Sequence, residues 1–314
     1  MKKKLILLSC YLSIALIFGA SVAGPQAAER QKVFALVPKL VGVSFYTDVE
    51  RGCTDEARTL AVKCLFVGPP TADAVAQEAI IGDLIARGVD GLAIAPNDPQ
   101  TVGSIITQAR AKGIPVITFD SDAPDTSRSS FIGTNNFQGG VEGGKAFRAA
   151  APGGGAYAIL TGGISADNLN ARIKGFRSAL GDSFHELDGS PFPCDDNPAV
   201  GTRIVLDILA KNPDIKGLFY SGGWPMFAPD NYAAAMEPYR NAIVSGRLVI
   251  VSFDAVDAQI KLLKAGLATA LIGQNPYRMG TSSVEILNDL AAGHNAPTLV
   301  DTGVTVIDAK LLNQ

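Results

Sequence analysis

The stretch Gly-Val-Asp-Gly-Leu-Ala-Ile-Ala-Pro-Asn-Asp at residues 88–98 decides the fold class. Its apolar segment Gly91–Pro96 has no polar residues in alternation. A strand of this kind is buried on both faces, which is typical of a parallel sheet covered by helices. A helix predicted over 99–112 leads to a second apolar strand at 115–119. Strand, helix and strand at this spacing predict a βαβ unit with a right-handed crossover.

The same alternation continues in both directions from this unit. On its N-terminal side we predict strands at 33–38 and 62–67 and helices at 49–60 and 72–87. After it, an extra strand at 130–134 precedes a new series of predicted strands, at 156–161, 184–187, 217–221, 248–253, 268–272 and 299–306. The helices between them are expected from about 138 and at 169–180, 199–211, 231–245, 256–265 and 279–292. A closed barrel would need eight similar units without a restart, so we predict an α/β protein of two Rossmann-like lobes with open parallel sheets.

The N-terminus has the features of an export signal. A positive Lys2–Lys4 precedes an apolar run at Leu5–Phe18, which is shorter than the ~20 residues that span a bilayer. The small residues of Ser21–Ala23 then form a cleavage site, so we expect residues 1–23 to be removed and the protein to be periplasmic. The alternatives are an uncleaved anchor and a lipoprotein box at Leu7–Cys10, although Cys10 comes before the apolar run ends.

Composition excludes several classes of function. The chain of 314 residues has a net charge of −3 and no basic stripe, so nucleic acid is not an expected partner. No Gly-rich stretch has the strand-to-helix context of a dinucleotide fingerprint, and there is no Walker motif. No cysteine or histidine spacing resembles a zinc site. We therefore expect no cofactor and no metal.

Three cysteines remain after the predicted cleavage: Cys53, Cys64 and Cys194. Cys53 is expected in the first turn of the helix 49–60, and Cys64 lies on the strand that follows. The chain reverses direction between the helix and the strand, so the two cysteines are expected at a similar position along the strand axis. An exported protein tolerates a Cys53–Cys64 disulfide. The alternative is that each cysteine is a small buried apolar residue.

Two predicted strands end in aspartate, one in each half of the chain. Asp120 ends Pro-Val-Ile-Thr-Phe-Asp, and Asp254 ends Leu-Val-Ile-Val-Ser-Phe-Asp. Ligands of open α/β sheets bind outside the carboxyl ends of the strands. A carboxylate there accepts hydrogen bonds from two neighbouring hydroxyl groups, as a sugar or polyol presents them. The alternatives are a pair of glycosidase carboxyls, or a cap for the following helix.

Aromatic and amide side chains follow other strand ends. Phe45 and Tyr46 lie in the expected loop after the first strand, and Trp224 follows Ser221-Gly222-Gly223. Their flat faces suit the C–H faces of a sugar ring, although the same residues could belong to the core. The remaining candidates offer polar side-chain or backbone groups, with a solvated turn or a helix cap as the alternative for Asp196: they are Ser121, Asn168, Asn170, Arg172, Asp196, Gly222 and Gln274.

Residues 88–124, together with Ile132–Asn136 and Val251–Asp254, resemble the ribose-binding-protein group of periplasmic binding proteins. The resemblance covers nearly the whole predicted mature chain. It implies two lobes joined by three crossover strands and closing over a sugar. The implied lobes are 24–134 with 275–301, and 135–274 with 302–314.

Carried over by position, the resemblance implies that the ligand contacts Phe45, Tyr46, Asp120, Asp254 and Gln274. The chain departs from the ribose-binding members at three places. Their arginine after the first aspartate is Ser121 here, their next sugar-binding arginine aligns with Asn170, and Gly222-Gly223 replace an Asn-Asp pair. These changes favour a different sugar or a polyol over ribose.

The predicted function is that of a monomeric solute-binding protein that delivers a monosaccharide or polyol to an ABC permease in the inner membrane, and not of an enzyme. One alternative is a ligand receptor for a sensor kinase or chemoreceptor, and a more remote one is an exported glycoside hydrolase. A sugar-responsive repressor would carry a helix-turn-helix at the N-terminus, where this chain has the signal sequence.

Overall fold

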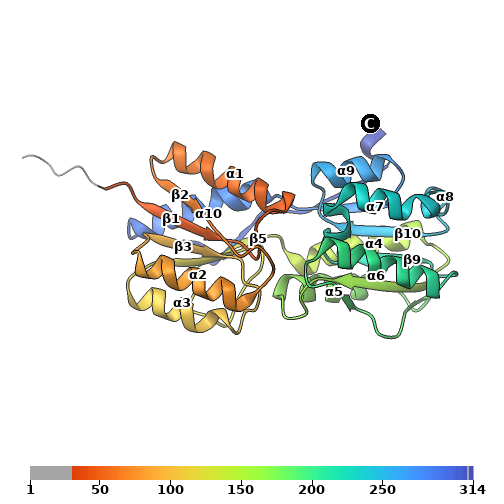
Figure 1. Cartoon of the computed structure of the whole chain (residues 1–314), viewed down its shortest axis with the longest axis horizontal. Coiled ribbons are helices and arrows are strands. Elements are labelled where there is room, and N and C mark those ends of the chain that lie inside the picture. The colour runs from red at the N-terminus through yellow and green to blue at the C-terminus, as the bar shows by residue number, and fades with distance from the viewer. Residues whose placement is uncertain (1–29, 310, 314) are drawn as a thin grey trace, which may run out of the picture. The chain divides into compact units, whose positions relative to one another are not determined.

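The computed structural model describes residues 30–309 and 311–313, so the predicted signal peptide lies outside the described residues. Two sheets organise this part of the chain (Figure 1). The first has six strands in the order β12-β5-β4-β3-β1-β2, and all neighbours are parallel. Its strands are β1 (Val33–Val37), β2 (Lys63–Phe66), β3 (Gly91–Ile94), β4 (Val116–Phe119), β5 (Phe131–Gly133) and β12 (Leu299–Asp301).

Four helices cover this sheet and complete what we call the first lobe: α1 (Ser44–Thr59), α2 (Ala74–Ala86), α3 (Val102–Ala111) and α10 (Pro276–Ala291). Separate apolar cores fill its two faces, one beneath α1 and α10 and the other beneath α2 and α3. The β3 strand is fully buried between them, as its apolar sequence predicts.

The second sheet has seven strands, in the order β13-β11-β10-β9-β6-β7 with β8 paired to β6. Only β13 is antiparallel, against β11. Its strands are β6 (Gly155–Thr161), β7 (Phe184–Glu186), β8 (Phe192–Pro193), β9 (Gly217–Tyr220), β10 (Val249–Phe253), β11 (Ala270–Gly273) and β13 (Thr305–Asp308). The prediction of an α/β protein with two parallel-sheet lobes is confirmed.

The helices of this second lobe are α4 (Asn136–Ala150), α5 (Asp167–Ala179), α6 (Pro198–Lys211), α7 (Pro229–Met236), α8 (Arg240–Val244) and α9 (Asp257–Lys264). Short 3₁₀ turns lie at Trp224–Phe227 (η1), Glu237–Tyr239 (η2) and Leu311–Asn313 (η3). Phe176 of α5 stacks on Phe219 of β9, with their ring centroids 4.0 Å apart. Burying each such side chain contributes about 1.5–3 kcal/mol.

Glycines let α4 and α5 pack very closely. A Cβ at Gly140 would collide with the backbone of Arg172, and one at Gly144 would lie 2.6 Å from the carbonyl oxygen of Phe176. A Cβ at Gly175 would collide with the backbone of Phe137 in return. This close contact fixes the position of α5, which carries residues of the site described below.

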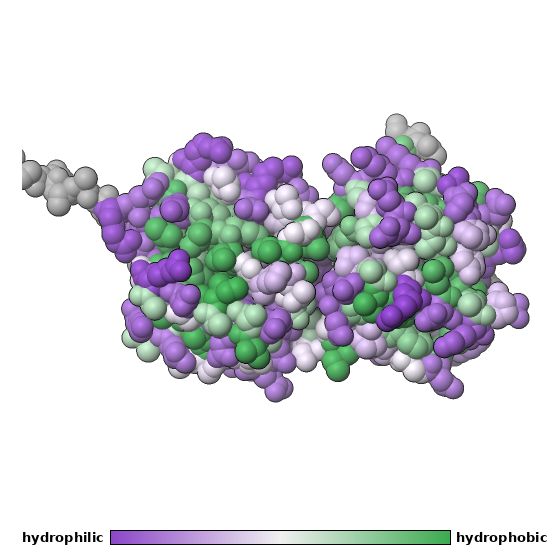
Figure 2. Space-filling model, viewed as in Figure 1, coloured by the Kyte–Doolittle hydropathy of each residue, from purple (hydrophilic) through white to green (hydrophobic). Residues whose placement is uncertain are grey.

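The chain passes between the lobes three times. It leaves β5 at Gly133 for α4, leaves β11 at Gly273 for α10, and leaves β12 at Asp301 for β13. From Gln31 onward the chain forms one compact unit. In Figure 2 the surfaces of the two lobes meet along a furrow.

Three local predictions were wrong, and one strand was missed. The helix predicted from Val49 begins at Ser44, because its buried face extends back to Phe45 and Tyr46. The helix predicted over 231–245 is divided at η2, where Pro238 lacks the N–H that a continuous helix needs. The strand predicted over 299–306 is two strands in different sheets, with Gly303 at φ +82° between them. The short strand β8 was not predicted.

A disulfide joins Cys53 to Cys64, whose Cα atoms lie 6.0 Å apart. It ties α1 to the edge strand β2. Because α1 begins five residues earlier than predicted, Cys53 lies in the middle of the helix and not in its first turn. Cys194 is buried and has a free thiol, and burial raises its pKa to about 12.

Candidate ligand-binding site

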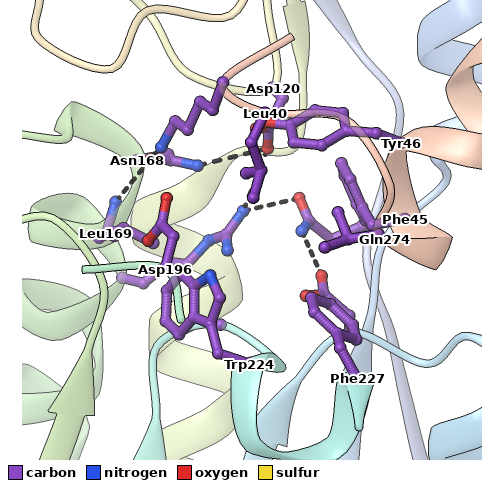
Figure 3. A pocket seen from close by; sticks show the side chains of 15 residues that line it. Leu40, Phe45, Tyr46, Asp120, Asn168, Leu169, Asp196, Trp224, Phe227 and Gln274 are labelled. Carbon is purple, nitrogen blue, oxygen red and sulfur yellow. Dashed lines mark hydrogen bonds and ion pairs between the residues drawn. The ribbon is translucent and has the colours of Figure 1, made fainter. Parts of the chain in front are cut away.

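A cavity of about 40 Å³ lies between the two lobes, at the carboxyl ends of strands from both sheets. The first lobe supplies the segment after β1, the first turn of α1 and the end of β4. The second lobe supplies α5 and the segments that follow β8, β9, β10 and β11. The lining residues are Lys39, Leu40, Val43, Phe45, Tyr46, Asp120, Asn168, Leu169, Arg172, Asp196, Gly222, Trp224, Phe227, Asp254 and Gln274 (Figure 3).

Asp120 is the first-lobe acid of the cavity. It leaves β4 with φ +57°, in the left-handed region that aspartate tolerates better than most residues. Tyr46 donates its hydroxyl to Oδ2 at 2.7 Å, and Asn168 donates Nδ2 to Oδ1 at 3.3 Å. The Arg172 guanidinium lies 3.8 Å from Oδ1. Asp120 therefore contacts the second lobe twice.

Asp254 is its counterpart in the second lobe. It leaves β10 with φ +60°, so the two strand ends share one backbone geometry. Gln274 donates Nε2 to Oδ1 at 2.6 Å, and the backbone N–H of Gly223 donates to Oδ2 at 3.2 Å. Burial raises the pKa of the Asp254 carboxyl above its ordinary value, although the Arg172 guanidinium acts in the opposite direction.

Arg172 connects these groups from α5. Its guanidinium donates to Asn136 Oδ1 at 2.8 Å, to the Ser221 carbonyl at 3.0 Å and to Gln274 Oε1 at 2.8 Å. It also lies 4.2 Å from the centre of the Phe253 ring, which adds a cation–π contact. Burial lowers the pKa of Arg172, and the neighbouring carboxylates oppose this shift. The planar guanidinium is thus held in one orientation beneath the cavity.

Lys39 crosses from the first lobe to the second and was not predicted as a site residue. Its ammonium donates to Asn168 Oδ1 at 2.9 Å, and only 4% of the residue is exposed. Burial lowers the Lys39 pKa, while Asp120 and Asp196 counteract that shift. A lysine in a loop ordinarily indicates a solvated surface, and the only signal for Lys39 is its place directly after the first strand.

Aromatic rings form the apolar part of the lining. Phe45 and Tyr46 lie in the first turn of α1 and not in a loop, in an edge-to-face pair with centroids 5.2 Å apart. Trp224 and Phe227 begin and end η1 in the second lobe. Figure 3 shows Phe45 and Tyr46 on one side of the pocket and Trp224 and Phe227 on another. The rings therefore come from both lobes.

The structure brings ten of the twelve predicted ligand residues to the cavity but not Asn170 and Ser121. Asn170 is exposed and donates its side chain to the Ile164 carbonyl. Asn168 and Arg172 lie four residues apart on one face of α5, whereas Asn170 is half a turn away and faces solvent. Ser121 follows the left-handed Asp120 and is fully buried outside the lining, with no hydrogen-bond partner for its hydroxyl in the described chain.

The lining residues that were not predicted are Lys39, Leu40, Val43, Leu169 and Phe227. Four are apolar, and nothing in their sequence context separates them from core residues. Within residues 30–309 and 311–313, no cluster of three or more His, Cys, Asp or Glu side chains could hold a metal ion. No helix in that same part of the chain is long and apolar enough to cross a membrane.

Comparison with known proteins places this architecture in a family. A family model described as a periplasmic binding protein domain matches residues 34–295. The chain belongs to the periplasmic binding protein family. The predicted resemblance to its ribose-binding-protein group is confirmed as well. The ribose import binding protein of Haemophilus influenzae is 28% identical over 299 residues, which cover 94% of this chain and 97% of that protein.

Other members of the family extend this similarity. The D-allose-binding periplasmic protein of Escherichia coli is 25% identical over 266 residues, covering 82% of this periplasmic binding protein and 83% of that one. Among solved structures, an ABC transporter solute-binding protein from Burkholderia graminis in complex with D-arabinose is 33% identical. Its TM-score is 0.81, with coverage of 90% of this chain and 97% of that one.

Proposed function

We propose that this periplasmic binding protein is the solute receptor of an ABC transporter and binds a neutral monosaccharide or polyol between its lobes. One observation supports this above all. Asp120 of the first lobe and Asp254 and Arg172 of the second line one cavity, with aromatic rings from both lobes. A ligand there contacts both lobes at once, so its binding favours their closed arrangement.

The chemistry of the lining matches a sugar. Carboxylate, guanidinium and amide groups hydrogen-bond to adjacent hydroxyls, and the rings pack against the C–H faces. The relatives whose names state a ligand bind ribose, D-allose or D-xylose, and the Burkholderia graminis structure holds D-arabinose. We extend the class of ligand to this chain, and not the identity of any one sugar.

The transport role includes three finer proposals. The chain is exported by cleavage after Ala23 and works in the periplasm. Its lobes, 24–134 with 275–301 and 135–274 with 302–314, move about the three chain crossings. The closed form delivers the unmodified ligand to a permease in the inner membrane, so the ligand recovered from the protein is chemically unchanged.

A thermal-shift screen of the purified protein tests the proposal. The panel contains D-ribose, D-allose, D-arabinose, D-xylose, D-tagatose, D-fucose and sugar alcohols. A ligand that binds only the folded state raises the melting temperature. We expect at least one panel member to do so. A panel without any shift contradicts the proposed ligand class.

The Asp254→Asn variant then tests the site. It keeps the shape of the side chain but removes its charge. Hydrogen bonds to charged groups contribute about 1.5–3 kcal/mol, so the dissociation constant for the active sugar rises about 10- to 100-fold. Asp207→Asn, on the exposed face of α6, is the matched control and leaves it unchanged. Equal affinities for both variants would show that Asp254 does not contact the ligand.

A further inference from the structure

Most polar groups of the cavity already have protein partners. Both oxygens of Asp120 and of Asp254 accept hydrogen bonds, and the Arg172 guanidinium donates three. Three lining groups differ in degree, because each leaves most of its donors, or a whole carboxylate oxygen, without a partner in the described chain. They are the ammonium of Lys39, the carboxylate of Asp196 and the indole N–H of Trp224.

Lys39 uses one of its three donors. The only hydrogen bond from its ammonium to another residue of the described chain goes to Asn168 Oδ1, at 2.9 Å. An ammonium carries three N–H groups and no acceptor. With 4% of the residue exposed, bulk water does not readily reach the remaining donors. A ligand atom with a lone pair supplies what they lack.

Asp196 keeps one oxygen free. The residue follows β8 with φ +55° and is 4% exposed. Its Oδ1 accepts from the backbone N–H of Gly163 at 3.2 Å, while Oδ2 has no partner within residues 30–309 and 311–313. Burial raises the pKa of Asp196, and the positive charge of Lys39 acts most strongly against that shift. The charges of Lys39 and Asp196 therefore interact electrostatically within the cavity.

Trp224 is fixed against two glycines. A Cβ at Gly162 would lie 2.7 Å from Cζ2 of the indole and would also collide with Asp196, while one at Gly222 would lie 2.6 Å from Cζ3. The residue is 7% exposed, and its indole N–H donates to no group in the part of the chain that the structure describes. Figure 3 shows the indole nitrogen turned toward the interior of the pocket, with the Asp196 carboxylate nearby.

We propose that Lys39, Asp196 and Trp224 form a subsite that recognises one uncharged hydroxyl group of the ligand. The hydroxyl oxygen accepts from Lys39 and Trp224, and its proton is donated to Asp196. This inference rests on the proposed sugar-binding function and specifies which residues set ligand choice.

The charges of Lys39 and Asp196 oppose each other, so the subsite has no net charge that would compensate the desolvation of an ion, and a neutral hydroxyl is favoured. A position without a hydroxyl leaves a buried donor and a buried acceptor unpaired. A site built to bond a hydroxyl rejects the analogue that lacks it far more strongly than an apolar pocket rejects an additional methylene.

A different role for Lys39 predicts a different result. If Lys39 only joins the lobes through Asn168, its removal weakens every ligand by the same factor. If it contacts a hydroxyl, its removal weakens only ligands that carry that hydroxyl. A cycle that combines protein variants with deoxy analogues separates the two cases, because coupled groups are non-additive.

The experiment uses the purified full-length mature protein and the panel sugar that raises its melting temperature most. Dissociation constants are measured by calorimetry for that sugar and for each of its monodeoxy analogues. The proteins are the wild type, Lys39→Met and Asp196→Asn. The matched controls are Lys112→Met, at an exposed position in the turn after α3, and Asp207→Asn, at an exposed position on α6.

We expect one monodeoxy analogue to bind the wild type and both controls about 10- to 100-fold more weakly than the parent sugar. On Lys39→Met and Asp196→Asn, that same analogue and the parent should differ by less than about threefold. The inference is overturned if every deoxy analogue loses the same factor on all five proteins. If the parent sugar binds the wild type and this additive result appears, the subsite is wrong while the proposed function stands. If no sugar binds the wild type, the proposed function itself fails.

Discussion

Replacement of Arg172 by methionine tests whether the buried charges of the cleft depend on this one cation. Methionine retains most of the aliphatic stem but removes three hydrogen bonds and the ion pair with Asp120 at 3.8 Å. Breaking a buried ion pair from one side costs about 3–5 kcal/mol, because the remaining charge stays buried without compensation. We expect the free energy of unfolding to fall by that amount. At about 2–4 °C per kcal/mol, the melting temperature falls by roughly 6–20 °C.

The control for this variant lies on the same helix. Arg177 makes two hydrogen bonds of 2.7 Å to Glu186 at the surface, where its side chain is 43% exposed. An exposed pair contributes at most about 1 kcal/mol, so Arg177→Met should be nearly neutral. Urea unfolding of both variants at pH 7, followed by circular dichroism, measures the difference. Equal losses for Arg172→Met and Arg177→Met would refute the dependence on Arg172.

The deficit of Arg172→Met should also shrink in acid. Burial raises the folded-state pKa of Asp254, and losing the guanidinium raises it further. A group with a raised folded-state pKa contributes stability that is fully present below its unfolded pKa and is lost as pH rises through the folded value. The variant therefore has its greatest deficit at pH 7 and a smaller one near pH 4. A deficit that stays constant between these pH values would contradict this account.

Two further predictions concern the disulfide and the pH dependence of binding. Replacing both Cys53 and Cys64 by serine should lower the free energy of unfolding by about 2–3 kcal/mol. A reductant should lower the urea midpoint of the wild type but not that of the double variant. Sugar affinity should fall as pH drops from 7 to 4, because hydroxyls favour the ionised forms of Asp196 and Asp254, whose pKa values burial raises in the sugar-free protein. Calorimetric titration should show that the affinity weakens by up to tenfold per pH unit for each proton that binding releases. The slope should be smaller for Asp254→Asn. An unchanged affinity at pH 4 would contradict the assignment of these carboxylates to the site.

The fold could be predicted because its signals are local. The unalternating strand at 91–96 and the strand-helix-strand spacing specify parallel sheets, and the restart near residue 130 indicates two of them. Element boundaries were less accurate where tertiary contacts decide them. Apolar and β-branched residues predominate at 299–306 and favour a strand, yet Gly303 turns the chain from one sheet to the other.

The site could be predicted at strand ends but less well on the helix. Asp120 and Asp254 are fixed by the ends of β4 and β10, so their approximate place follows from the sheet topology. On α5 the helical phase matters, and a shift of two residues exchanges a cavity-facing position for a solvent-facing one. The phase is visible only once Asp167 is known to begin the helix, which selects Asn168 and Arg172 and excludes Asn170.

The missed lysine shows what sequence patterns do not contain. A net charge of −3 spread over 314 residues gives no hint that two cations and three carboxylates share one cavity. Their proximity follows from strand ends of the two sheets that converge on one cavity, and in the proposed closure of the lobes each charge loses water. Desolvation of charges opposes closure, and hydrogen bonds to the charged groups offset it. A ligand rich in hydroxyls supplies an acceptor to Lys39 and a donor to Asp196. The charges whose desolvation opposes the proposed closure of the lobes are therefore the same charges whose hydrogen bonds to the ligand favour it.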